Sequence, residues 1–208
     1  LSHLISTFVL SLSDVAVTFI GDLRYAALTV NSNSTFIVNN SATLGTGDID
    51  VQAGSTITGQ ASKLSGETIT GSGTVNITNI ESNSSANFSN IAASTTLNVS
   101  SSADVNYTGN LTNVDNLTIA SSTTFTIDAS IIENINTTNN GTVVVNNLQD
   151  VTNFDFSNIP AGTVNTSWSG TGTFTGDLTG VDSLEVSSGT LSIDDSILGT
   201  TTITGNGN

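Results

Sequence analysis

Few side chains of this 208-residue chain can carry catalytic chemistry. His3 is its only histidine, Arg24 and Lys63 are its only basic residues, and it has no cysteine. Acid–base or nucleophilic catalysis needs a titratable group held beside a partner that suits its task. A Ser-His-Asp arrangement would have to use His3, which lies in the least regular part of the sequence. We therefore predict that the chain is not an enzyme and has no catalytic residues.

The acidic residues are the remaining candidates for chemistry, and some of them form close pairs. Asp48 and Asp50 are separated by a single residue, and Asp194 precedes Asp195 directly. Polysaccharide-degrading β-helices use paired carboxylates, usually with a Lys or Arg nearby to stabilise developing charge. The two basic residues stand alone in the sequence, so solvated turns are the simpler interpretation of these pairs.

Calcium binding is the other chemistry that these acids could support. Ca²⁺ takes about six to eight oxygen ligands, but neither an EF-hand loop nor a Gly-Gly-x-Gly-x-Asp nonapeptide occurs. Several acids recur at related turns, which allows a cation to bridge neighbouring segments or subunits. We predict no other cofactor. The weak candidate ligands for Ca²⁺ are Asp48, Asp50, Asp115, Asp182, Asp194 and Asp195.

Composition narrows the classes of partner. The formal net charge is −15, from 17 acidic and two basic residues. Binding to nucleic acid or to an anionic membrane needs clustered Lys and Arg, so we predict neither nucleic-acid binding nor membrane insertion. Residues 1–30 are the most apolar part, but Asp14 and Asp22 interrupt them and no basic stretch precedes them. We expect a terminal capping or assembly segment there, rather than a signal peptide or membrane span.

An internal repeat organises the rest of the chain. Residues 73–95 read GTVNITNIESNSSANFSNIAAST, and residues 141–163 read GTVVVNNLQDVTNFDFSNIPAGT, an offset of about 68 residues. Repetition at a fixed period is the signature of repeat architectures. Three copies fit, at approximately 5–72, 73–140 and 141–206, so residues 31–208 are predicted to be one repetitive domain.

Each copy contains short strands rather than helices. Apolar residues alternate over a few positions, as in Leu117–Ile119, Phe125–Ile127 and Leu191–Ile193, and Gly, Asn, Ser or Asp then break the run. Such alternation predicts strands with one buried face. Evenly spaced turns divide the repeat into coils of roughly 17–23 residues. The predicted fold is all-β, a parallel β-solenoid (β-helix). The alternative is a string of tandem β-sandwich modules, for which one copy of the repeat would be short.

Blocks such as NLTNVDNLTIASSTTFTID at 110–128 resemble the repeats of bacterial surface β-solenoids. These include autotransporter passengers and filamentous-haemagglutinin-like adhesins. The resemblance rests on composition and rhythm, and it covers most of the chain from about Leu28 onward. It implies secretion, a right-handed parallel coil, and a role in adhesion or filament building at the cell surface.

These observations predict a structural, rod-forming module of an extracellular bacterial filament or surface adhesin. Its partners would be copies of itself, joined head to tail or laterally through β edges, and host or matrix glycans. One alternative is the shaft or receptor-binding part of an adhesin or phage fibre. Remote alternatives are a polysaccharide-degrading β-helix and an ice-binding solenoid, the latter because Thr-x-Thr steps occur at Thr56/Thr58, Thr68/Thr70 and Thr202/Thr204.

Two further features have more than one interpretation. About a dozen Asn-x-Ser/Thr sequons occur, among them Asn98, Asn106, Asn110, Asn116 and Asn165, and a composition this rich in Asn, Ser and Thr produces sequons by chance. Trp168 is expected to fill the core, with an exposed sugar-stacking role as the alternative.

Overall fold

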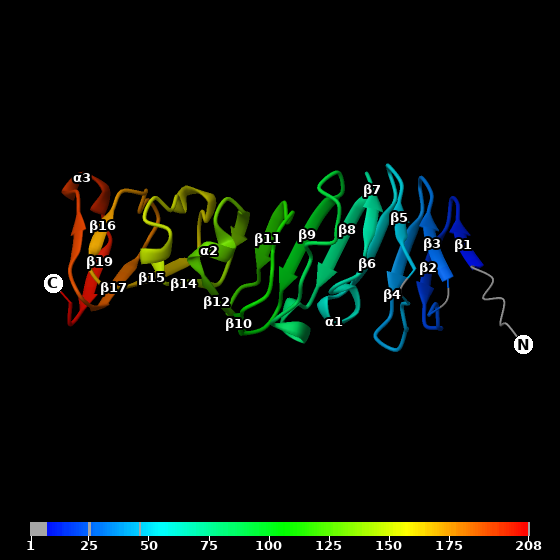
Figure 1. The fold of residues 1–208 in the computed structure, drawn as a ribbon, viewed down its shortest axis with the longest axis horizontal. Helices are drawn as coiled ribbons and strands as arrows, with labels where there is room; N and C mark the ends of the chain where they lie inside the picture. Colours follow the sequence, from blue (N-terminus) through cyan, green and yellow to red (C-terminus); the bar gives the residue numbers. More distant parts are fainter. Residues whose placement is uncertain (1–7, 25, 46, 208) are drawn as a thin grey trace, which may run out of the picture. The chain divides into compact units, whose positions relative to one another are not determined.

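A computed structural model describes residues 8–24, 26–45 and 47–207, so His3 and Tyr25 lie outside the described residues. The chain divides into two compact units. Unit 1 comprises Leu1–Val99 with Asn110–Asp115, and unit 2 comprises Ser100–Gly109 with Asn116–Asn208. Both units are built almost entirely of short β-strands (Figure 1).

Unit 1 contains two parallel sheets with the strand orders β1-β3-β5-β7 and β2-β4-β6-β8-β9. Strands consecutive in sequence thus alternate between the sheets, except where β9 follows β8 in the second sheet. The strands are β1 (Phe8–Leu12), β2 (Ala16–Phe19), β3 (Ala26–Val30), β4 (Thr35–Val38), β5 (Ile49–Val51), β6 (Thr56–Gln60), β7 (Ile69–Gly71), β8 (Thr74–Thr78) and β9 (Thr96–Ser101), whose last two residues belong to unit 2.

Unit 2 contains parallel sheets with the strand orders β10-β12-β14-β15-β17-β19, β11-β13 and β16-β18. In the six-stranded sheet, hydrogen-bonded neighbours therefore follow one another in chain order. The strands are β10 (Val105–Tyr107), β11 (Asn116–Ile119), β12 (Thr124–Asp128), β13 (Asn136–Asn139), β14 (Thr142–Asn146), β15 (Thr163–Ser169), β16 (Gly172–Phe174), β17 (Ser183–Ser188), β18 (Leu191–Ile193) and β19 (Thr202–Gly205).

Paired strands lie at a nearly constant separation along the chain. Thr56 pairs with Thr74, and Thr74 in turn pairs with Thr96. In unit 2, Thr124 pairs with Thr142. These separations fall within the coil length that the sequence predicts. Every strand pairing of the described residues is parallel, whereas immunoglobulin-like sandwiches are antiparallel. The pairing therefore does not support the sandwich alternative, and the all-β parallel fold is confirmed.

The register places like residues above one another in the core. In unit 1, Phe36, Ile57, Val75 and Leu97 pair in sequence, and all four side chains are fully buried. In unit 2 the corresponding column contains Phe125, Val143 and Val164. Each unit thus buries a continuous apolar interior, because alternate residues of every central strand point inward. Removing this apolar surface from water is the main favourable term in folding.

Helical structure is limited to single turns. The α-helices are α1 (Ala61–Leu64), α2 (Ala129–Ile132) and α3 (Asp195–Leu198), and the 3₁₀-helices are Ile80–Asn83, Leu148–Asp150 and Phe156–Asn158. α1 and α2 lie one copy of the repeat apart, as do the strands β6 and β12 that precede them. The sequence repeat is therefore also a structural repeat. One-turn helices are too short to produce a helical period, which is why the sequence did not reveal them.

The described part of residues 1–30 contributes β1, β2 and β3 to the same two sheets that the following strands extend. Residue 30 is therefore no boundary in the sheets. The capping or assembly role of this segment remains a prediction.

Candidate functional site

Two of the six candidate calcium ligands make equivalent contacts in the two units. The Asp115 carboxylate accepts a hydrogen bond from the Leu97 backbone N–H at 2.7 Å, and the Asp115 N–H donates to the Leu97 carbonyl at 2.9 Å. Asp182 makes the same pair of bonds with Val164, at 2.8 and 2.8 Å. These acids recur because each satisfies a strand N–H of the preceding coil, a contact that the second and third copies of the repeat share.

The other four candidates lie at separate places. Asp50 is on β5 and accepts a hydrogen bond from the Gln52 amide, while Asp48 is exposed just before that strand. Asp194 caps α3 by accepting the Ser196 N–H at 2.8 Å, and Asp195 is the first residue of that helix. Among the described residues, no group of three or more His, Cys, Asp or Glu side chains could hold a metal ion. Calcium bridging between molecules remains a prediction.

One type of surface turn, which recurs along the chain, accounts for many of the polar residues. In this Asx turn, the side-chain oxygen of an Asn or Asp accepts the backbone N–H of the next residue but one, which is usually Ser or Thr. Eight such turns with Ser or Thr occur in the described residues. They begin at Asn39, Asn83, Asn87 and Asn110 in unit 1, and at Asp128, Asp155, Asp177 and Asp194 in unit 2.

The hydrogen bonds of these turns also shift the pKa values of the aspartates that accept them. The Ser157 side chain and then its backbone N–H hold the pKa of Asp155 below its usual value, and Ser196 does the same for Asp194. Desolvation opposes this effect at Asp128, but hydrogen bonds from Asn147 and Ser130 still leave its pKa lowered. Glu67 in unit 1 behaves oppositely, because burial raises its pKa. None of these carboxyls faces a second titratable group in an arrangement that would move a proton.

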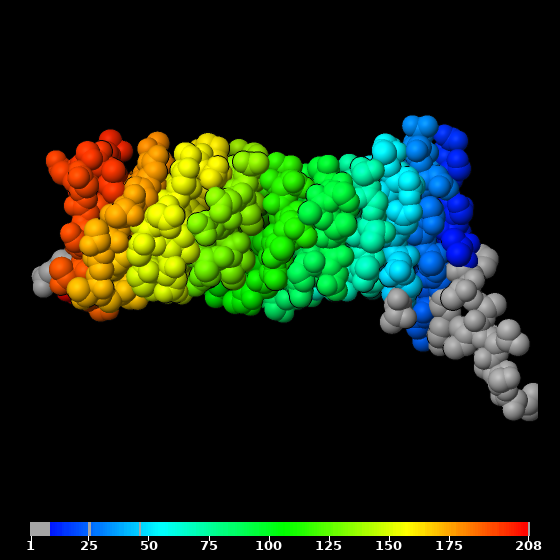
Figure 2. All heavy atoms as spheres, turned by 45° about the horizontal axis from the view of Figure 1, so that its top comes forward, coloured from blue at the N-terminus to red at the C-terminus, as the bar shows by residue number. Residues whose placement is uncertain are grey.

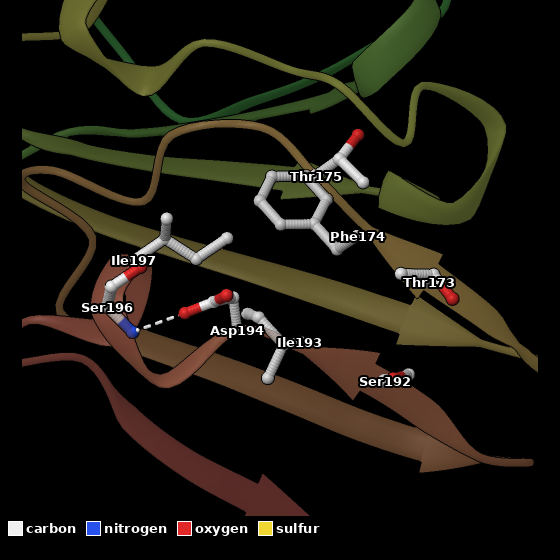
Figure 3. A pocket seen from close by; sticks show the side chains of 8 residues that line it. All are labelled: Thr173, Phe174, Thr175, Ser192, Ile193, Asp194, Ser196 and Ile197. Carbon is white, nitrogen blue, oxygen red and sulfur yellow. Dashed lines mark hydrogen bonds between the residues drawn. The ribbon is translucent and has the colours of Figure 1, made fainter.

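A hollow in unit 2 has a volume of about 570 Å³ and lies between β16, β18 and α3 (Figure 3). Phe174, Ile193 and Ile197 form its apolar side. Its single carboxylate, Asp194, points toward the Ser196 N–H to which it is bonded (Figure 3). The pocket lacks the paired acids of a glycosidase and has no cation in its lining.

The helix beside this hollow is less covered than its equivalents. Leu64 of α1 and Ile132 of α2 are fully buried, but the equivalent Leu198 of α3 is only half-buried. The hollow lies between α3 and β16, which precedes it in the chain, and Figure 2 shows a notch between the orange and red surfaces at this end.

Threonines line the outer face of the sheets in register. Thr35, Thr56, Thr74 and Thr96 form one column in unit 1. Thr124, Thr142 and Thr163 form the equivalent column in unit 2. The neighbouring column in unit 1 is mixed, because Ile37, Thr58, Asn76 and Asn98 follow one another there, with the Asn98 amide donating to Asn76 at 2.9 Å.

The remaining sequence predictions concern Trp168 and the membrane. Trp168 is buried in the core with its indole N–H donating to the Gly170 carbonyl at 3.1 Å, so the core interpretation is confirmed. Among the described residues, no helix is long and apolar enough to cross a membrane. Comparison of the chain with protein-family models, with curated proteins and with solved structures finds no match.

Proposed function

We propose that the chain is a parallel β-solenoid and serves as a rod-forming structural module of an extracellular bacterial filament or surface adhesin. The observation that carries this proposal is the register. In each unit, identical or similar residues stack above one another through successive parallel strands, both in the core and on the outer face. Such stacking lets each strand satisfy its neighbours' backbone groups and extends without limit.

The distribution of polar groups supports a structural role. Within the described residues, no buried side-chain nitrogen or oxygen lacks a hydrogen-bond partner. The carboxylates of Asp115 and Asp182 and the eight Asx turns use their oxygens to hold backbone N–H groups. An enzyme or ligand site usually leaves convergent polar groups unsatisfied in a cleft. Here the same groups complete the fold, which favours a non-enzymatic protein.

The outermost strands provide a means of self-association. β1 and β2 are the last described strands of their sheets in unit 1, and β19 is the last in unit 2. Large apolar side chains are exposed there, with Val9 at 54%, Ile20 at 68% and Ile203 at 46% exposure. An unpaired apolar strand edge is a template for pairing with another chain, and head-to-tail pairing without closure builds a filament.

Negative-stain electron microscopy at rising protein concentration, with and without Ca²⁺, tests this proposal. We expect filaments of uniform width that lengthen with concentration, and Ca²⁺-dependent growth would assign the acids to bridging. Ile203→Lys places a charge on the edge strand β19 and should stop growth. Ile37→Lys is the matched control, because Ile37 is 39% exposed but lies on β4, which is paired on both sides. Filaments of the Ile203→Lys variant that lengthen as those of the unmodified chain do would exclude assembly through this edge.

The threonine columns favour ice binding as a second candidate function. Neighbouring strands lie about 4.8 Å apart, so each Thr column presents a single row of hydroxyl and methyl groups at one regular spacing. Ice binding would depend on this row, because the neighbouring column of unit 1 is mixed. Thermal hysteresis of the purified chain, compared with Thr56→Lys and Thr74→Lys variants, decides the question. A freezing point that differs from the melting point only in the unmodified chain would support ice binding.

A further inference from the structure

The sequons of this chain fall into structurally different classes. Twelve Asn-x-Ser/Thr sequons occur in the sequence. Transfer of an oligosaccharide to Asn requires that the acceptor segment leave the protein surface and enter the active site of an oligosaccharyltransferase. A sequon in the middle of a sheet cannot do this, because its backbone is hydrogen-bonded on both sides. Six sequon asparagines lie on strands, of which β10 and β13 are at sheet edges and the other four are paired on both sides, namely Asn76, Asn98, Asn106, Asn116, Asn136 and Asn165.

Four of the other six sequons are also tied to the fold. Asn33 donates its amide to Asp14 at 3.2 Å. The middle residues of the sequons at Asn87 and Asn110 are Phe88 and Leu111, both buried in the core. The sequon at Asn140 ends on Thr142, which is the first residue of β14. Each of these segments would have to unfold locally before it could enter an enzyme.

The two remaining sequons share one local structure on the surface of unit 1. They read Asn39-Asn40-Ser41-Ala42 and Asn83-Ser84-Ser85-Ala86. In each, the alanine N–H donates to the asparagine carbonyl, at 2.9 and 3.0 Å, and the alanine side chain is buried. The sequon residues are exposed apart from Asn83, which is partly covered as the last residue of the 3₁₀-helix Ile80–Asn83. The Asn39 N–H donates to the Phe19 carbonyl at 3.0 Å, so in both segments the side chains of the asparagine and serine, rather than the whole backbone, are presented at the surface.

The side-chain geometry of these two turns is also the same. The Ser41 hydroxyl donates to the Asn39 Oδ1 at 2.9 Å, and the Ser85 hydroxyl donates to the Asn83 Oδ1 at 3.1 Å. The backbone N–H of each serine donates to the same oxygen. Within the described part of the chain, the Nδ2 of neither asparagine has a hydrogen-bond partner. The oxygen is thus held by the turn, and the nitrogen is presented to solvent.

From this geometry we infer that Asn39 and Asn83 are acceptor sites for N-linked glycans on the folded protein. The sugar donor is a lipid-pyrophosphate-linked oligosaccharide. The asparagine Nδ2 attacks the anomeric carbon of the first sugar and an N–C bond forms. The bond from that carbon to the pyrophosphate oxygen breaks, the lipid pyrophosphate leaves with the electron pair, and Nδ2 loses one proton. The inference goes beyond the structural role proposed above and does not depend on filament formation.

The test treats the purified, folded chain with a single-subunit oligosaccharyltransferase that accepts Asn-x-Ser/Thr and with its lipid-linked donor. Glycopeptide mass spectrometry then reports the occupancy of every sequon. We expect glycans at Asn39 and Asn83, and background occupancy at the strand sequons Asn76 and Asn98. The urea-unfolded, refolding-blocked chain is the control, since strand sequons should become substrates once the sheets are lost.

Two matched variants keep the turn but remove the acceptor. Asn39→Asp and Asn83→Asp retain the turn oxygen, which is a carboxylate oxygen in the Asx turns of unit 2. Each variant should lose its own glycan while its circular dichroism and thermal midpoint stay unchanged. Glycans on Asn76 or Asn98 of the folded chain would overturn the inference. So would a folded chain that stays unmodified while the unfolded chain is glycosylated.

Discussion

Unit 1 and unit 2 build the same surface turn from different residues. Among the residues that the structure describes, the four Asx turns with Ser or Thr in unit 1 begin with Asn, and the four in unit 2 begin with Asp. Asn87 and Asp155 are equivalent in the repeat, and each accepts the N–H of the following turn serine, at 2.9 and 2.8 Å. The turn therefore needs an oxygen acceptor at this position and does not need a charge.

The two units that differ by Asn or Asp at these turns also differ in formal charge. Unit 1 contains seven acidic residues and both basic residues, whereas unit 2 contains ten acidic residues and neither basic one, so the formal charges are −5 and −10. An isolated parallel bridge between backbones joins Asn87 and Asn110 in unit 1, so two neutral side chains begin neighbouring turns there. The equivalent backbone bridge in unit 2 joins Asp155 and Asp177, so two ionisable side chains begin the neighbouring turns. The same surface turns therefore carry neutral Asn side chains in unit 1 and titratable Asp side chains in unit 2.

The largest expected effect on stability concerns the buried phenylalanines that directly follow the first residue of two equivalent turns. Phe88 and Phe156 are equivalent and buried, so replacing either with alanine should cost about 3–5 kcal/mol of unfolding free energy. Phe156 also lies against Phe154, with ring centroids 4.5 Å apart, so Phe156→Ala should cost about 1 kcal/mol more than Phe88→Ala. Urea unfolding followed by circular dichroism measures both values, and a larger cost at Phe88 would contradict this ranking.

The second test concerns a contact that the units share unchanged. Asp115→Ala and Asp182→Ala each leave a strand N–H, of Leu97 or Val164, without its acceptor, which should cost about 1–3 kcal/mol. Asp→Asn at either position keeps an oxygen acceptor and should cost less. Amide hydrogen exchange of Leu97 and Val164 measures the effect directly. Equal acceleration in the two units is expected, and a fast amide at only one position would show that the contacts differ.

These aspartates also mark the limit of what the sequence could predict. The recurrence of Asp115 and Asp182 was visible, but their partners lie on the preceding coil, and only the strand register reveals them. The sequence could therefore list these acids only as weak candidate calcium ligands, whereas the register shows which backbone groups they hold. The alternation of apolar residues did predict the strands, and the constant offset between copies did predict equivalent elements, because both patterns follow directly from burial.

The sequons are a second example of structure that the sequence alone could not predict. Composition alone suggests that Asn-x-Ser/Thr arises by chance, yet four of the twelve sequons coincide with Asx turns, which need Asn or Asp two residues before Ser or Thr. No single sequence distinguishes an Asn on a strand from an Asn in a turn with its amide in solvent. The single-turn helices were missed for a comparable reason, since one turn is too short to display a period.

A third test exchanges the turn residues between the units. The pKa of Asp155 is lowered in the fold, so its contribution to stability is complete above the unfolded pKa of about 3.9 and is lost as pH falls through the folded value. Asp155→Asn should leave stability at pH 7 unchanged and remove this acid-induced loss. Asn87→Asp should introduce such a loss into unit 1. Hydrogen exchange of peptides spanning each turn from pH 5 to pH 2.5, corrected for intrinsic rates, should show acid sensitivity moving with the aspartate.

The smallest expected effect comes from Glu67, where unit 1 responds to acid with the opposite sign. Burial raises the pKa of Glu67, so its protonated form is favoured in the fold and the associated stability, complete below the unfolded pKa, is lost as pH rises through the folded value. Glu67→Gln mimics the protonated form and should raise the unfolding free energy at pH 7 by at most about 0.5 kcal/mol. The gain should vanish near pH 4 in urea titrations. A gain from Glu67→Gln that persists at pH 4 would mean that packing rather than ionisation is responsible, and acid would then distinguish the two units only through the turn aspartates.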